Sequence, residues 1–280
     1  MKQTKLISRT NTPSIGQNGD MQISRYQGLG NDFLITFLED LPNDPFVIAR
    51  HLCDRKNSIG ADGLIFGTPS TSGDAFFTLF NSDGSEAEVS GNGLACFGYA
   101  IHRNDITKEL ITIETATAEH KIWIRKISNN SASVEASLNT PNNGPAFDDL
   151  KIDLGGTKHT RAASVDVGNP HLIIEVEDIE GIDLGEVGPK LEAFFMPVGC
   201  NIHLVSISDD QEIQVRHWER GVGLTEACGS GAVASAWAAH QWGVVSNDVQ
   251  VGMPGGTASV SLGERPTYMC EVIYEGEFEV

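Results

Sequence analysis

The alternation of hydrophobic and polar residues along the chain predicts mainly β-strands, with a few helical segments between them. Segments 22–37, 109–127 and 161–178 are rich in β-branched and aromatic residues, which is typical of strands. Turn-forming pairs such as Asp83-Gly84 separate these runs. The pattern therefore predicts curved or mixed sheets made of short strands.

Three segments show helical character instead. Segment 44–53 opens with Asp44-Pro45, a typical helix start. Segments 91–105 and 229–243 are apolar and rich in alanine, and Gly243 suits a helix end. We expect an α+β fold in which each of two sheets is accompanied by one long helix.

The two long helical segments begin with matching sequences. SGNGLACFGYA starts at Ser90 and CGSGAVASAWA starts at Cys228, so the two copies lie 228 − 90 = 138 positions apart. Each follows an acidic, turn-rich stretch. This spacing indicates a duplicated domain, and the turn-rich NNGP at 142–145 fits a boundary between the copies.

Charge and cysteine content narrow the class of protein. The chain has 280 residues, and its net charge of −19 argues against a nucleic-acid or membrane-surface partner. No apolar run reaches the ~20 residues of a membrane-spanning helix. The five cysteines are scattered and odd in number, which favours reduced thiols and a cytoplasmic location.

The glycine-rich helix starts carry the candidate chemistry. A helix N-terminus presents free backbone N–H groups that bind carboxylates, and it lowers the pKa of a thiol placed there, such as Cys228. Two such starts facing each other would place one acid/base group on each side of a Cα, as inversion of a stereocentre requires. Neither a metal nor a cofactor is needed. The alternative is an inert, buried Cys228 that only caps its helix.

Five sequence blocks resemble the diaminopimelate epimerase family. They occur in the family's order and spacing, and the resemblance covers roughly Met21 to Val280. The blocks are Gly28-Leu-Gly-Asn-Asp-Phe33, Asn81-Ser-Asp-Gly84, Gly91-Asn-Gly93, Gly168-Asn-Pro-His171, and Glu219-Arg-Gly221 with Ala227-Cys-Gly-Ser-Gly231.

The resemblance implies two similar domains, each a curved mixed sheet wrapped around a central helix, with a cleft between them. We place the first domain at 21–136, completed by a C-terminal strand from about 267–280, and the second at 137–266. Residues 1–20 are polar and are expected to form a flexible extension. The family interconverts LL- and meso-diaminopimelate without a cofactor, in lysine and cell-wall precursor biosynthesis, and a homodimer is possible.

The resemblance also assigns residues. Cys228 matches one catalytic cysteine, and Ser90 stands where the other cysteine would be. His171 and Glu219 match residues that modulate the pKa of the catalytic groups. The positions matching substrate-binding residues are Asn31, Asn81, Gly91, Asn92, Asn169, Asn201, Glu219, Arg220, Gly229 and Ser230.

Several of these residues have ordinary structural alternatives. Asparagines at turns often serve backbone geometry, and Glu219-Arg220 could be a solvated pair. We expect His203 and His217 to be structural.

Ser90 and Gly63 depart from the family pattern. A serine hydroxyl is a poor base, so Ser90 leaves three explanations open: a lineage with a Ser/Cys pair, a protein limited to one-sided chemistry, or an engineered replacement. Cys96 is ~8 Å further along the helix axis and too distant to substitute for it. Gly63 stands where the family often has glutamine.

Three functions therefore remain in view. The first is epimerisation of diaminopimelate, and the second is a related racemase, isomerase or dehydratase reaction on another amino acid. The third is non-catalytic binding of an amino acid.

Overall fold

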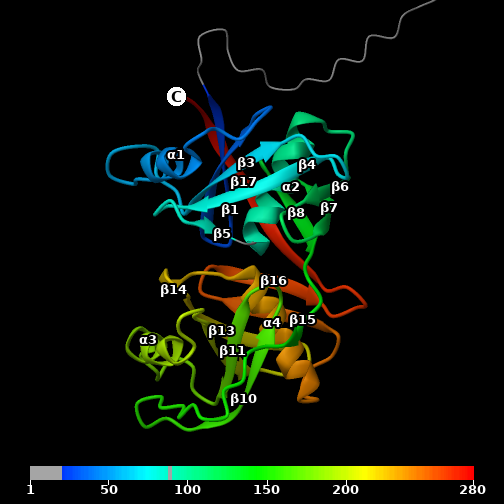
Figure 1. The fold of residues 1–280 in the computed structure, drawn as a ribbon. Helices are drawn as coiled ribbons and strands as arrows, with labels where there is room; N and C mark the ends of the chain where they lie inside the picture. The colour runs from blue at the N-terminus through cyan, green and yellow to red at the C-terminus, as the bar shows by residue number, and fades with distance from the viewer. Residues whose placement is uncertain (1–20, 88–89) are drawn as a thin grey trace, which may run out of the picture.

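The computed structural model describes residues 21–87 and 90–280, which form two halves stacked end to end (Figure 1). The predicted extension at 1–20 lies outside the described residues. In the figure the upper half runs from blue to cyan-green and includes the red C-terminal strand. The lower half runs from green to orange.

The first half contains helices α1 and α2 and strands β1 to β8. Its elements are β1 (Gln22–Gly28), β2 (Asn31–Phe37), α1 (Pro45–Leu52), β3 (Gly63–Thr68), β4 (Ala75–Asn81), β5 (Glu86–Ala87), α2 (Gly91–Asn104), β6 (Leu110–Glu114), β7 (Glu119–Ile127) and β8 (Ser131–Ser137).

The second half repeats this order of elements. It comprises β9 (Asn142–Asn143), β10 (His159–Asp166), β11 (Pro170–Val176), α3 (Leu184–Phe194), β12 (Asn201–Ile207), β13 (Glu212–Glu219), β14 (Gly223–Thr225), α4 (Gly229–Gln241), β15 (Asp248–Met253), β16 (Gly256–Ser261) and β17 (Thr267–Glu279).

Strand pairing in the two halves matches step by step. In the first half β1–β2 is antiparallel, β2–β3 parallel, β3–β4 antiparallel, β4–β6 parallel and β6–β7 antiparallel. In the second half β10–β11, β11–β12, β12–β13, β13–β15 and β15–β16 repeat the same sequence of directions. The internal duplication predicted from the helix starts is thus a duplication of topology.

The C-terminal strand β17 belongs to both halves. It pairs with β8 on one side and β1 on the other, which closes the first sheet into a ring. Its first residues also pair with β16 of the second half. β17 therefore joins the chain end to the first half, although the exact domain boundaries stay a prediction.

Each sheet wraps around one buried helix. Helix α2 contacts β1, β2, β6, β7, β8 and β17, and helix α4 contacts β10 to β13 and β15 to β17. Every residue of α2 from Gly91 to His102 is buried, and α4 is buried along most of its length. The predicted α+β architecture with central helices is confirmed.

The three predicted helices are confirmed, but the hydrophobic pattern missed α3. Helix α3 contains Gly185, Gly188 and Pro189, residues that weaken helix formation in isolation. Its buried residues, including Leu184 and Leu191, pack against the outside of the second sheet, so tertiary packing stabilises the helix.

Candidate functional site

The two glycine-rich helix starts meet at the junction between the halves. A Cβ atom on Gly91 would lie 3.0 Å from the Cα of Gly229, and a Cβ on Gly229 would lie 2.9 Å from the Cα of Gly91. Only glycine at both positions allows the backbones to approach this closely. Ser90 and Cys228 immediately precede this contact, so the structure brings the two predicted catalytic positions together.

Ser90 and Cys228 have the same role at their helices. Each is the N-cap in an extended conformation. The Ser90 Oγ accepts a hydrogen bond from the Gly93 N–H at 3.0 Å, and the Cys228 Sγ accepts one from the Gly231 N–H at 3.4 Å. The two side chains are therefore oriented by equivalent backbone donors.

The predicted lowering of the Cys228 pKa is wrong. Burial raises the pKa of the Cys228 thiol well above its ordinary value, and the negative charge of Glu219 raises it further. Hydrogen bonds from Ser230 and the Gly231 amide act in the opposite direction. Desolvation outweighs the helix N-terminus, so the resting side chain is a neutral thiol.

Glu219 lies at the end of β13, next to the thiol. Desolvation also raises the pKa of the Glu219 carboxyl group, while the side chains of Thr225 and Cys228 counteract part of the rise. A carboxylate of raised basicity beside a protonated thiol is suited to exchange a proton with it. The structure thus places Glu219, one of the predicted modulating residues, against Cys228.

A hydrogen-bonded network connects the asparagines of the first half. Asn92 donates from Nδ2 to the Asn31 Oδ1 at 2.6 Å, and Tyr268 donates from its hydroxyl to the Asn92 Oδ1 at 2.5 Å. Asn31 in turn donates from Nδ2 to the Asp62 Oδ2 at 3.3 Å. Asn31 and Asn92, both predicted to bind substrate, are held together at the start of α2.

Ion pairs hold the acidic residues next to this network in place. Arg55 Nη2 contacts the Asp32 Oδ1 at 2.5 Å and the Asp62 Oδ1 at 2.7 Å, and Arg25 also pairs with Asp32. Burial alone would raise the pKa of Asp32, but these two arginines reverse the shift and lower it. The Asp32 carboxylate next to Asn31 is therefore charged, and the two arginines hold it in place.

Asn201 and Arg220 are joined in the second half. Asn201 donates from Nδ2 to the Pro170 carbonyl oxygen at 3.0 Å, and its Oδ1 accepts the Arg220 backbone N–H at 3.0 Å. The guanidinium of Arg220 donates to the Val198 carbonyl at 2.9 Å. Arg220 is consequently part of the folded site and is not a loosely solvated side chain.

Asn169 and His171 begin a chain of buried rings. His171 Nε2 lies 2.8 Å from the Asn169 Oδ1, and His171 Nδ1 lies 2.8 Å from the His203 Nε2. His203 Nδ1 lies 2.9 Å from the His217 Nδ1. Both nitrogens of His171 are thus engaged away from Cys228, and its predicted effect on the catalytic pair stays a prediction.

The other residues singled out from the sequence make few contacts with the catalytic positions or none. Asn81 donates from Nδ2 to the Ser85 Oγ at 3.0 Å within its own turn, as the structural alternative would have it. Ser230 Oγ lies 3.6 Å from the Cys228 Sγ. Gly63, where the family often has glutamine, leaves no room for a side chain, because a Cβ would lie 2.9 Å from both Leu79 Cδ1 and the Phe80 carbonyl oxygen.

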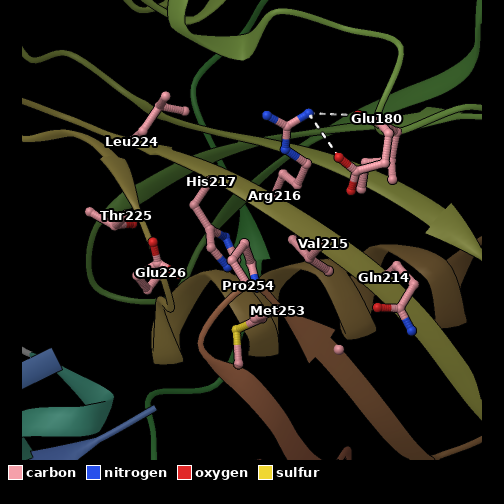
Figure 2. A pocket seen from close by; sticks show the side chains of 12 residues that line it. Glu180, Gln214, Val215, Arg216, His217, Leu224, Thr225, Glu226, Met253 and Pro254 are labelled. Carbon is pink, nitrogen blue, oxygen red and sulfur yellow. Dashed lines mark hydrogen bonds and ion pairs between the residues drawn. The ribbon is translucent and has the colours of Figure 1, made fainter. Parts of the chain in front are cut away.

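A groove of about 450 Å³ lies beside the second half of the site. Its lining includes His217, Thr225, Glu226 and Met253, and Figure 2 shows Arg216 turned away from His217, toward Glu180. A second cavity, of about 520 Å³, lies near Pro170 and Phe195. Neither cavity is lined by Ser90 or Cys228.

Sequence reasoning missed several residues that organise the site. Tyr268, Asp62 and Arg55 hold the first-half asparagines, and His203 and His217 extend from Asn169. Asp62 directly precedes a strand start and lies in the same sequence block as Gly63, which is the kind of signal that could have identified it. Nothing local to Tyr268 in the sequence indicates that its hydroxyl reaches α2.

Within the described residues, no group of three or more His, Cys, Asp or Glu side chains is arranged to hold a metal ion. No helix of the described ranges, 21–87 and 90–280, is long and apolar enough to cross a membrane.

Comparisons with known proteins identify relatives over almost the whole chain. The family model for diaminopimelate epimerase matches residues 23–138 and 163–276. The diaminopimelate epimerase of Caldanaerobacter subterraneus subsp. tengcongensis is 37% identical over 93% of this chain and 100% of its own length. That of Methanothermobacter thermautotrophicus is 35% identical over 87% of this chain and 91% of its own length.

Solved structures share the fold at low sequence identity. A hydroxyproline epimerase from Agrobacterium vitis has a TM-score of 0.70 and 15% identity, covering 93% of this chain and 92% of its own. A PhzF-family phenazine biosynthesis protein from Bacillus anthracis has a TM-score of 0.68 and 18% identity, covering 93% and 99%. From the family match and the curated relatives together, the chain belongs to the diaminopimelate epimerase family, a family of isomerases.

Proposed function

We propose that the protein inverts the α-carbon of LL-diaminopimelate to give meso-diaminopimelate. The observation that carries the proposal is the contact between Gly91 and Gly229, because the residues directly before these glycines are the two N-capping side chains, Ser90 and Cys228. Asn92 next to Gly91, with its partner Asn31, and Arg220 next to Glu219, with its partner Asn201, supply polar groups suited to a substrate that carries two amino-acid heads. Relatives of 33–37% sequence identity that are named diaminopimelate epimerases support this choice of substrate.

The substrate carboxylate would bind the backbone N–H groups of the paired helix starts, including those of Gly91, Asn92, Gly229 and Ser230. Hydrogen bonds from these amides spread the negative charge that develops when the α-proton leaves. Asn169 and Asn81 are assigned to the polar groups of the substrate by the same proposal.

Proton transfer starts from the neutral thiol. Cys228 passes its proton to the Glu219 carboxylate, and the resulting thiolate removes the α-proton from one face. Ser90, directly or through a water molecule, supplies a proton to the opposite face and regains one from solvent. Glu219 then returns its proton to the surrounding solvent, so the product differs from the substrate only at the stereocentre.

Deuterium uptake at Cα from heavy water tests this assignment. The unmodified protein should exchange the α-proton of both LL- and meso-diaminopimelate, and Cys228→Ala should lower the exchange rate by about 10²-fold or more, because the base is removed. Cys53→Ala, which changes a buried thiol at the end of α1, is the control and should retain exchange.

Full exchange by Cys228→Ala would contradict the role of Cys228. Exchange with other L-amino acids and none with diaminopimelate would indicate a related racemase or isomerase. Calorimetric binding of diaminopimelate with no exchange at high protein concentration would indicate a non-catalytic binding protein.

A further inference from the structure

Three fully buried histidines form a linear series of hydrogen-bonded rings that starts at Asn169. The ring contacts run from Asn169 through His171 and His203 to His217, with successive distances of 2.8, 2.8 and 2.9 Å. They come from adjacent strands, since His171 pairs with Asn201 in β12 and His203 pairs with His217 in β13. The chain of rings therefore crosses the second sheet from β11 to β13.

All three rings are neutral near pH 7. Burial lowers the pKa of His171 to about 3 and of His217 to about 3, and it lowers the pKa of His203 as well. The described neighbours offer no carboxylate to any of the three rings through a hydrogen bond. Each ring consequently carries one N–H and one acceptor nitrogen.

The Asn169 amide determines which nitrogen carries each proton. Its Oδ1 can only accept, so His171 donates from Nε2 and its Nδ1 must accept. His203 then donates from Nε2 to His171, and His217 donates from Nδ1 to His203. The predicted pattern is Nε2–H, Nε2–H and Nδ1–H along the chain.

The far end of the chain supports this direction. His217 Nε2 is buried without a hydrogen-bond partner among the described residues. In the predicted pattern this atom is an unpaired acceptor, whereas the reversed pattern would bury an unpaired N–H. Buried unpaired N–H groups are the rarer of the two in folded proteins.

The hydrogen-bonded histidines also fix the orientation of the Asn169 Nδ2 group. Because Oδ1 of Asn169 is held by His171, its Nδ2 is turned away from the histidines and makes no hydrogen bond within 21–87 and 90–280. Rotating the amide would require all three histidine protons to move together. On the side away from the histidines, Asn169 therefore has its two Nδ2 donors available and no acceptor.

The series of histidine rings packs against α4, the helix that Cys228 caps. A Cβ on Gly231 would lie 2.3 Å from the His203 Cε1, so this ring touches the start of α4, three residues after Cys228. His217 lies two residues before Glu219 on the same strand. The His203 ring therefore packs on the first turn of the helix that Cys228 caps, and His217 belongs to the strand that ends at Glu219.

We propose that His203 and His217 are positioning residues that hold the Asn169 amide with its Nδ2 donors facing a carboxylate of the substrate. The identity of that carboxylate rests on the proposed function, while the proton pattern of the three rings does not. Neither histidine touches the reacting atoms.

Nitrogen NMR of the protein labelled with ¹⁵N-histidine tests the proton pattern without any activity assay. The expected spectrum at pH 7 has His171 and His203 as Nε2–H tautomers and His217 as the Nδ1–H tautomer, all three without titration between pH 8 and 6. The reversed pattern, or a charged ring among the three at pH 6, would overturn the proposal.

Kinetics of variants test the positioning role. His217→Leu removes the donor to His203 and should raise KM for diaminopimelate by about 3- to 10-fold with a smaller change in kcat, as expected for the loss of one net hydrogen bond to substrate. His217→Gln keeps an amide donor and should restore most of the affinity. His240→Gln, on the far end of α4, is the control.

The experiments distinguish a failure of the positioning role from a failure of the proposed function. An unchanged KM in His217→Leu, with the protein folded, would overturn the positioning role. If the unmodified protein shows the predicted tautomers but no exchange with diaminopimelate, the proposed function fails and the histidine pattern stands.

Discussion

At the scale of single residues, the site is symmetric in backbone and asymmetric in chemistry. Ser90 and Cys228 cap their helices through the same backbone contact, but only Cys228 carries an ionisable thiol. A hydroxyl binds its proton far more tightly than a thiol does. We therefore expect Cys228 to be the base in the direction that removes the α-proton from its own face. In the reverse direction Ser90, directly or through a water molecule, takes the proton and Cys228 returns one to the opposite face.

Replacing Ser90 with cysteine should speed epimerisation. The thiol would occupy the same N-cap position next to Gly93 and could act as a base as well as an acid, so we expect a gain of at least about tenfold in kcat. The measurement is circular dichroism or α-proton exchange with each stereoisomer. Ser90→Thr, which keeps a hydroxyl, is the matched control, and an unchanged or slower rate in Ser90→Cys would contradict the assignment.

At the scale of elements, the catalytic geometry depends on two helices that begin against each other. Their sequence signature predicted both helices and both caps, because Gly-rich starts and Ala-rich bodies are local signals. Their contact could not be predicted, since it depends on how two sheets separated by 138 positions curl around their helices. The same holds for Tyr268, whose hydroxyl reaches Asn92 across the ring, and for the line of His171, His203 and His217, which only strand register reveals.

Adding a methyl group at the helix contact should separate the helix starts. In Gly229→Ala the new Cβ would lie 2.9 Å from the Gly91 Cα, and we expect a loss of about 1–3 kcal/mol in the free energy of unfolding, together with a large loss of exchange activity. Urea denaturation measures the former. Ser235→Ala on the same helix removes a buried hydroxyl that has no hydrogen-bond partner among the described residues, so this variant should be neutral or stabilising. Equal stability of Gly229→Ala and the parent would refute the steric argument.

At the scale of the whole molecule, acid should unfold the protein through its buried histidines. The pKa values of His171 and His217 are lowered to about 3, and the unfolded value is about 6.5. Their stabilising contribution is therefore fully present above about pH 6.5. Below that pH the unfolded chain binds protons that the folded chain cannot, so stability falls as pH decreases toward 3.

Between about pH 6.5 and 3, each such histidine should lower the free energy of unfolding by about 1.4 kcal/mol for every pH unit of acidification. We expect the unfolding free energy from urea titrations to fall by roughly three times this amount per unit between pH 6 and 5, when all three rings contribute. His203→Gln should reduce the slope by about one proton. A flat profile over this range would mean that the rings accept protons in the folded state.

The closing role of β17 has a consequence during protein synthesis. The ring of the first half cannot be completed until residues 267–279 are made, so β1 and β8 present unpaired edges while the whole second half is translated. A nascent chain in this condition is exposed to wrong strand pairing. The first half to be synthesised is thus the last to be finished, and emergence of residues 267–279 from the ribosome becomes the step that commits the chain to its native sheet.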